Sequence, residues 1–403
     1  MKSPPFFIIS MLVLMACAPE PTATTTPTSL PTGVSSLQLN PDKAEIVRLS
    51  GMFRSADFIR LATSENHLID EVRKLQVRGD KLYFMCNSAI FAFDTTGAFV
   101  FQINRKGKGP GEYVSLTDMH LSSAGDTIEV LDNVSRSVLT YDQQGRYLQQ
   151  WNIPFVAQSF SKLSEDLYVF YCGNMLMEEN SYKLVFYSKR QHTPLKQFFT
   201  VNANEARYLH ARDLVNFSAY GSRLTFLHSF NDTIYSLQPS GVQYRFVCEF
   251  GPYQTPADFY ATAYQDVAEF MQTAEQSAYA YRLAGFFETD HLILFAFRQK
   301  GHWYHVFYPK NKGIPTVAHQ IMDDLAFHGL IYDTSFDNLP KAAAGNTMYR
   351  LMEPSVFIEQ LEAVKSSLSK NEWETYTRTQ PHLMEIYHSL KLNDNPLVYL
   401  LRE

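Results

Sequence analysis

The stretch at 105–114, RKGKGPGEYV, combines three cations with four glycine or proline residues. Cationic side chains and glycine amides together are able to bind a phosphate or another anion. A Walker-type loop, however, needs Gly-Lys-Ser/Thr at its end and a helix after it, and neither follows here. We therefore interpret the stretch mainly as a turn, in which glycines supply positive φ and proline adds stiffness. Its candidate ligand contacts are Arg105, Lys106, Lys108 and Glu112.

A second set of polar residues follows strand-like segments elsewhere in the chain: Asp132, Asn133, Arg136, Asn231 and Asp232. Side chains of this kind form a binding site when their turns meet on one face of a fold. We expect them to converge with the basic stretch around the mouth of a channel. The alternative for each residue is an ordinary solvated rim.

Other reactive residue types lack a spacing that chemistry requires. His302 and His305 are three apart, so on a strand they point to opposite faces and form a poor metal clamp. Neither a Gly-x-Ser-x-Gly elbow nor HExxH is present. Cys86, Cys172 and Cys248 fall in apolar strand-like runs, which indicates buried thiols, of which at least one is free. We predict no catalytic residue, no metal and no cofactor.

An internal repeat supplies the elements that position these residues. The segments 79–103 and 125–151 each contain Gly-Asp, an alternating apolar strand, a polar turn, a second strand ending in aromatic-Asp, a tight glycine turn and a third strand. Weaker copies lie near 165–199, 221–250 and 290–313. Units of several short strands at this period are typical of β-propeller blades. The basic stretch then lies in a crossover between two blades.

Two segments depart from the strand pattern. Residues 255–284 and 354–390 show helical spacing of apolar residues, and we predict helical insertions there. Residues 396–401 look like a last strand, which we expect to close the ring beside an N-terminal strand near 45–49, because closure removes exposed sheet edges.

The N-terminus has the features of an exported protein. The apolar run at 6–15 is too short to span a bilayer and fits a signal peptide. The sequence Leu14-Met15-Ala16-Cys17 resembles the lipobox of bacterial lipoproteins, which makes Cys17 the lipidated residue; the alternative is a plain secretory signal. Residues 18–36 are rich in proline and threonine and suit an extended spacer. We predict a signal peptide at 1–16, a tether at 17–40 and one propeller domain at 41–403.

Composition limits the partners. The chain has 35 basic and 41 acidic residues and a net charge of −6. Phosphate neutralisation needs a basic face, so we expect no nucleic-acid partner. Aromatic residues make up 14% of the chain, which favours β structure.

Four stretches carry a family resemblance: ENHLIDEVRKLQVRGDKLYF, GKGPGEY, NDTIYSL and the terminal DNPLVYLL. With them the chain resembles the six-bladed β-propeller lipoproteins of Bacteroidetes, relatives of NHL-type and TolB-like propellers. The resemblance covers roughly residues 42–403. It implies an all-β fold with six blades and a place in the cell envelope, anchored to the outer membrane on its periplasmic or its surface side. It implies no assigned activity.

Two functions fit these features. The first is a non-catalytic binding or scaffolding lipoprotein, a monomer held to the membrane by its lipid, that presents a propeller face to a glycan, peptide or partner protein. The second is a propeller enzyme of the lyase, hydrolase or lactonase type with its site at the channel mouth. We favour the first, because the polar residues are mixed in type and lack the spacing of any reaction.

Overall fold

A computed structural model describes residues 22–23, 34–122, 125–208, 215–228 and 230–403. The strands of the described chain form six β-sheets of four to six strands, and the helices are concentrated in two insertions. Among the described residues no helix is long and apolar enough to cross a membrane.

The first three sheets follow one another along the chain, each with its strands in sequence order. Sheet 1 contains β5 (Lys74–Arg78), β6 (Lys81–Met85), β7 (Ile90–Asp94) and β8 (Phe99–Ile103). Sheet 2 contains β9 (Asp118–Leu121), β10 (Thr127–Asp132), β11 (Ser137–Asp142) and β12 (Tyr147–Asn152). Sheet 3 contains β13 (Ser159–Lys162), β14 (Leu167–Tyr171), β15 (Tyr182–Ser188) and β16 (Thr193–Thr200), with β1 (Thr22–Ala23) at its edge.

The other three sheets each include a strand from the N-terminal part of the chain. Sheet 4 contains β17 (Phe217–Tyr220), β18 (Arg223–Phe226), β19 (Thr233–Gln238), β20 (Gly241–Glu249) and β2 (Ser35–Gln38). Sheet 5 contains β21 (Ala280–Glu288), β22 (Leu292–Gln299), β23 (His302–Pro309), β24 (Thr316–Asp323), β25 (Leu330–Asp333) and β3 (Glu45–Arg48). Sheet 6 contains β26 (Ala342–Ala344), β27 (Thr347–Met352), β28 (Leu397–Arg402) and β4 (Ser55–Arg60).

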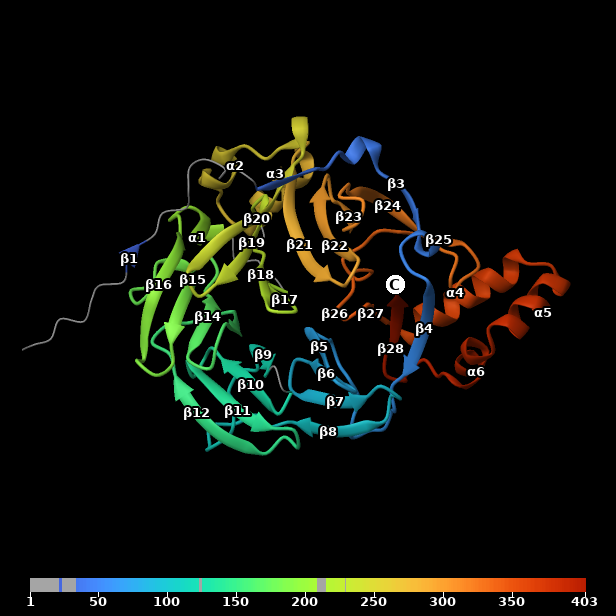
Figure 1. Ribbon diagram of the computed structural model, residues 1–403, viewed down its shortest axis with the longest axis horizontal. Coiled ribbons are helices and arrows are strands. Elements are labelled where there is room, and N and C mark those ends of the chain that lie inside the picture. Colours follow the sequence, from blue (N-terminus) through green and yellow to red (C-terminus); the bar gives the residue numbers. More distant parts are fainter. Residues whose placement is uncertain (1–21, 24–33, 123–124, 209–214, 229) are drawn as a thin grey trace, which may run out of the picture.

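The sheets are arranged as a β-propeller around a centre (Figure 1). The first strand of each sheet contacts the first strand of the next sheet, and β26 of sheet 6 contacts β5 of sheet 1. In Figure 1 β5, β9 and β26 lie toward the centre, whereas β8, β12 and β16 lie outside. The predicted all-β propeller is therefore confirmed, and the repeated segments correspond to successive sheets.

The last strand, β28, pairs in sheet 6 with β4 from the N-terminal part of the chain. Strand β28 pairs antiparallel with β4 along its whole length, from Leu397 opposite Arg60 to Arg402 opposite Ser55. The expected partner near 45–49 is wrong, because β3 pairs in parallel with β24 instead. The burial of the two strands explains the difference: β3 buries only Val47, as suits an outer edge, whereas β4 buries both Phe58 and Ile59.

The first helical insertion is shorter than predicted. It contains α2 (Ala257–Ala261) and α3 (Val267–Gln276), where Asp266 caps the amides of Ala268 and Glu269. The expected helix up to 284 is wrong at its end, because β21 begins at Ala280. Nearly every residue of β21 is buried. The spacing of apolar residues alone does not distinguish such a fully buried strand from a buried helix.

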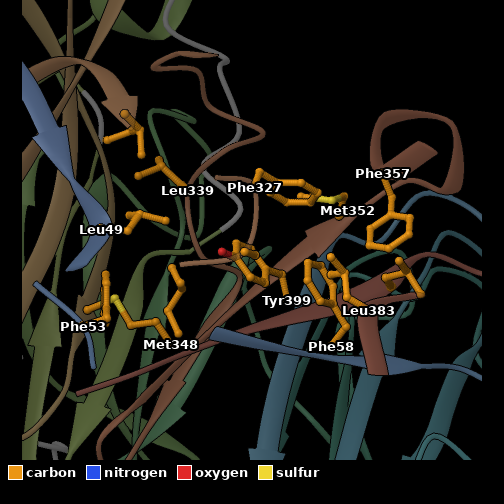
Figure 2. Close-up of a cluster of buried hydrophobic side chains, with 14 of the residues drawn as sticks. Leu49, Phe53, Phe58, Phe327, Leu339, Met348, Met352, Phe357, Leu383 and Tyr399 are labelled. Atoms are coloured by element: carbon orange, nitrogen blue, oxygen red, sulfur yellow. The ribbon is translucent and has the colours of Figure 1, made fainter. Parts of the chain in front are cut away.

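The second helical insertion matches its predicted range. It contains α4 (Pro354–Ser367), α5 (Lys370–Thr379) and α6 (Pro381–Ser389), while the short α1 (Glu205–Tyr208) lies elsewhere. Figure 2 shows Phe357 and Leu383 of this insertion beside Phe58 and Tyr399. The Phe58 ring stacks on Tyr399 at 4.5 Å and meets the edge of Phe357 at 5.2 Å. The helices of this insertion thus cover β4 and β28.

The three cysteines of the described chain behave as predicted. Cys86, Cys172 and Cys248 are buried and form no disulfide. Burial raises the pKa of each thiol well above its usual value, so these side chains act as small apolar core groups. The predicted lipid attachment site, Cys17, lies outside the described residues.

Candidate functional site

The basic stretch is a tightly bonded crossover between β8 and β9. The Tyr113 hydroxyl donates to the carbonyls of Ser88 and Ile103, at 2.7 and 3.1 Å. The Glu112 carboxylate accepts a hydrogen bond from the Gly109 amide at 2.8 Å. These bonds agree with the interpretation of the stretch as a turn.

The glycines of this crossover have different roles. Gly111 has a φ of +73°, and a Cβ there would lie 2.6 Å from Cγ of Tyr147. Gly109 has no positive φ, so the expectation of left-handed backbone is wrong at this position. A Cβ at Gly107 would lie 2.0 Å from a carboxylate oxygen of Glu112, so the Glu112 side chain would have to move.

The predicted turn residues serve local structure. The buried Asp132 carboxylate accepts bonds from the amides of Val114 and Ser115, at 2.7 and 3.2 Å, so it ties the β10–β11 turn to the basic crossover. Asn133 follows it in that turn. Arg136 forms an ion pair with Glu179 at 2.8 Å.

Asn231 and Asp232 lie two sheets away, in the turn before β19. The Asn231 side chain bonds to the backbone of Thr233 and His228, and the Asp232 carboxylate accepts a bond from Gln254 at 2.8 Å. The structure therefore brings the basic crossover and Asp132 together, but places Arg136 against Glu179 and the Asn231–Asp232 turn in sheet 4. Arg105, Lys106 and Lys108 are exposed. A ligand-binding role for this set stays a prediction.

A cavity of about 770 Å³ lies elsewhere, along the centre of the propeller. Residues from the first strands of all six sheets line it, together with the turns that follow those strands. None of the predicted ligand residues is among its lining. Successive antiparallel strands alternate in direction, so the crossovers and the second-to-third turns lie at the opposite end of the strands from these first-to-second turns. The cavity opens at what we call the turn end, and the predicted set lies at the crossover end.

The cavity narrows toward the crossover end. A small adjoining space of about 20 Å³ is lined there by Arg73, Arg282, Phe336 and Lys341, among others. That volume has room for about one water molecule. The Arg73 guanidinium donates to the carbonyls of Leu116 and Thr117 at 2.9 and 3.2 Å, which fixes it between sheets 1 and 2.

Two buried ion pairs hold neighbouring sheets together beside the cavity. Lys74 of β5 contacts Asp118 of β9 at 2.8 Å, and the other Asp118 oxygen accepts the Phe160 amide of β13 at 2.9 Å. Lys162 of β13 contacts Glu129 of β10 at 3.6 Å. The first pair joins sheets 1 and 2, and the second pair joins sheets 2 and 3.

A third cluster surrounds Glu288 at the end of β21. Its carboxylate is only 1% exposed and contacts Arg245 at 2.8 Å, Lys310 at 2.8 Å and Arg223 at 3.5 Å. Three cations therefore share one carboxylate, and Arg223 is the one that also lines the cavity.

His120 is a neutral side chain of the cavity lining. Burial lowers its pKa to about 3, and the positive charges of Lys74, Lys162 and Arg78 act in the same direction. The imidazole is therefore neutral at pH 7 and adds no positive charge to the cavity wall.

Metal chemistry has no evident site in the described part of the chain, where no group of three or more His, Cys, Asp or Glu side chains is suitably placed. His305 is buried and its Nε2 lies 2.8 Å from the Ser335 carbonyl, whereas His302 is exposed. The prediction that these two histidines do not act together agrees with this geometry.

Sequence reasoning missed the cations of the cavity. Arg78 directly precedes the repeated Gly79-Asp80, and Arg223 directly follows the Gly221-Ser222 turn. The repeat is evident from the glycine onward, whereas the strand that lines the centre lies before that glycine. The same repeat, continued toward the N-terminus, contains this strand.

The family model for a domain of unknown function, DUF4934, matches residues 34–402. The chain belongs to this family. Its fold is similar to that of an exported protein from Bacteroides fragilis, with a TM-score of 0.67 and 16% identity over 92% of this chain and 99% of that one. A DUF4221 member from Bacteroides vulgatus has a TM-score of 0.50 and 9% identity over 87% and 98% of the two chains. No protein with a curated description matches the chain. At these identities the DUF4934 chain shares only its fold with the two structures.

Proposed function

We propose that this DUF4934 protein is a cell-envelope lipoprotein whose six-bladed propeller binds a ligand, without catalysis, in the cavity at its turn end. One observation carries the proposal: a cavity of about 770 Å³ is lined by the first strands of all six sheets. Small-molecule sites usually measure about 300–1,000 Å³, so a small molecule or the end of a glycan or peptide chain fits.

The envelope location and the blade count have separate support. The similar Bacteroides fragilis protein is described as exported. The lipobox at Cys17 accounts for membrane attachment after export. Six sheets whose first strands contact one another in turn support a count of six blades.

The experiment fills the cavity and measures binding. Ser218 of β17 lines the cavity, and Ser218→Phe adds bulk there. Gln149→Phe adds the same side chain on the exposed outer strand β12 and is the matched control. Ligands are first found by screening the full-length protein in detergent against glycan and peptide collections.

Isothermal titration then compares the three proteins with each ligand. We expect the control to bind like the parent and Ser218→Phe to bind at least about tenfold more weakly, a change of about 1.4 kcal/mol. Circular dichroism checks that both variants are folded. Undiminished binding by a folded Ser218→Phe variant would show that the site is not in the cavity.

A further inference from the structure

We propose that the cavity binds a small organic anion, which Arg78 and Arg223 contact at the mouth and Lys341 contacts nearer the inner end. The inference rests on the proposed binding function and names its ligand class: a molecule with carboxylate, sulfate or phosphate groups.

The lining has an excess of positive charge. Seven lysine or arginine residues line the cavity and its small inner extension, against three acidic residues. The inner extension has four basic residues and no acidic residue in its lining. The whole protein has a net charge of −6, so this excess is local and opposite in sign to the rest of the molecule.

Not all of these cations are available to a ligand. Lys74 and Lys162 have buried carboxylate partners behind them in Asp118 and Glu129. Their charges are therefore largely neutralised by the protein itself. The inference rests on Arg78 and Lys341, which have no ion-pair partner among the described residues, and on Arg223, which shares Glu288 with two closer cations.

Two arginines face the mouth from opposite sides of the ring. Arg78 ends β5 of sheet 1, and Arg223 begins β18 of sheet 4, three sheets further around the ring of six. Arg78 is exposed and forms no ion pair with any residue that the structure describes. Arg223 is 51% exposed and shares Glu288 with two closer cations. Guanidinium groups bind carboxylates and phosphates with two parallel hydrogen bonds, so both arginines suit an anionic ligand.

Lys341 extends the positive charge inward. It lines both the cavity and the inner extension, and its amine lies 5.0 Å from the centre of the Phe336 ring. Among the described residues it has no carboxylate within ion-pair distance. Burial lowers the pKa of Lys341, while the negative charges of Asp337 and Glu71 oppose that shift.

Each acidic residue of the lining has a partner in the protein, and Glu165 lies 3.4 Å from the Lys162 amine. Asp290 accepts a hydrogen bond from the Tyr220 hydroxyl at 3.0 Å. The Glu165 side chain is 97% exposed. Glu288 is occupied by its three cations. The groups left to meet a ligand inside the cavity are therefore mainly cationic donors.

The test measures affinity by titration with galacturonate, glucuronate and their short oligomers, with hexose sulfates and hexose phosphates, and with the matching neutral sugars. The full-length protein is compared with Arg78→Gln, Arg223→Gln and Lys341→Gln. Lys370→Gln, which removes an exposed cation on α5, is the matched control, and Lys106→Gln tests the alternative site at the crossover end.

We expect at least one acidic ligand to bind while its neutral counterpart does not. Each cavity substitution should weaken binding about tenfold or more, as for the loss of one charge-assisted hydrogen bond. Lys370→Gln should leave affinity unchanged. Raising the salt from about 0.05 M to about 0.5 M should weaken binding, because the Debye length shortens.

Two results would overturn the inference while leaving the proposed function in place. One is a neutral ligand that Ser218→Phe excludes and that binds equally well to all three cavity variants. The other is an anion whose affinity falls with Lys106→Gln and not with the cavity substitutions. If no ligand of any charge is sensitive to Ser218→Phe, the proposed function fails as well.

Discussion

A buried hydrogen bond joins β24 of sheet 5 to β28 of sheet 6, and its removal is a sharp test of the packing. The Tyr399 hydroxyl of β28 donates to the Asp323 carboxylate of β24 at 2.6 Å. Both residues are fully buried. Tyr399→Phe removes the hydroxyl and leaves the ring in its stack on Phe58.

The expected loss follows from the charge of the acceptor. Hydrogen bonds to charged groups contribute about 1.5–3 kcal/mol, against about 0.5–1.5 kcal/mol for neutral pairs. Tyr376→Phe is the matched control, because the Tyr376 hydroxyl donates to the neutral Ala326 carbonyl in the same core cluster. Urea unfolding followed by tryptophan fluorescence should show a larger loss of unfolding free energy for Tyr399→Phe than for Tyr376→Phe.

The difference between the two variants should depend on pH. Burial raises the pKa of Asp323 in the folded protein, while the bond from Tyr399 opposes that rise. A raised carboxyl pKa favours folding at low pH, and the contribution is lost as the pH rises through the folded pKa. Without the hydroxyl the pKa rises further, so the cost of Tyr399→Phe is larger at pH 7 than near pH 4, where the carboxyl is increasingly protonated.

Measurements at the two pH values would decide the matter. If the two variants lose the same free energy at pH 7, and if the loss for Tyr399→Phe does not change with pH, then Asp323 is not a charged acceptor and the reasoning is wrong.

Three further predictions concern the anchor, the closure and the basic crossover. Cys17→Ser should move the protein from the membrane fraction to the soluble fraction on cell fractionation, because it removes the lipidated residue; a variant that stays with membranes contradicts the lipobox interpretation. Deleting the chain after Asn393 removes β28 and exposes the edge of β4, so light scattering should reveal aggregation; a deletion variant as stable as the parent argues against closure by this strand. Gly111→Val should destabilise the protein by about 1–3 kcal/mol through its positive φ, and further through contact with Tyr147, whereas Gly109→Val should cost less; equal thermal denaturation midpoints for the two variants would contradict this.

The repeated strands were predictable because their signal is local. Gly79-Asp80 and Gly125-Asp126 mark equivalent turns, and alternating apolar residues on either side identify the strands. The C-terminal helical insertion was predictable for the same reason, since Phe357, Leu361 and Val364 recur at helical spacing. The pairing of the last strand was not predictable, because nothing local in residues 45–60 tells which of β3 and β4 meets β28.

The cavity was not predictable, because its lining comes from six separate strands. Arg78 and Arg223 are far apart in sequence and belong to sheets on opposite sides of the ring. The sequence favours the basic crossover as a binding site because its cations are close together in the chain. These cations lie at the crossover end of the strands, whereas the cavity opens at the turn end. The cations that are close together in the sequence belong to a turn. The excess of cations around the centre arises only when the six sheets assemble.

The most direct test of the account is a crystal structure of the protein bound to the anionic ligand with the highest affinity. The account predicts ligand density in the central cavity at the turn end, with Arg78 or Arg223 in contact with its anionic group. Density at the crossover end instead, against Arg105, Lys106 or Lys108, would contradict the assignment of the cavity as the binding site.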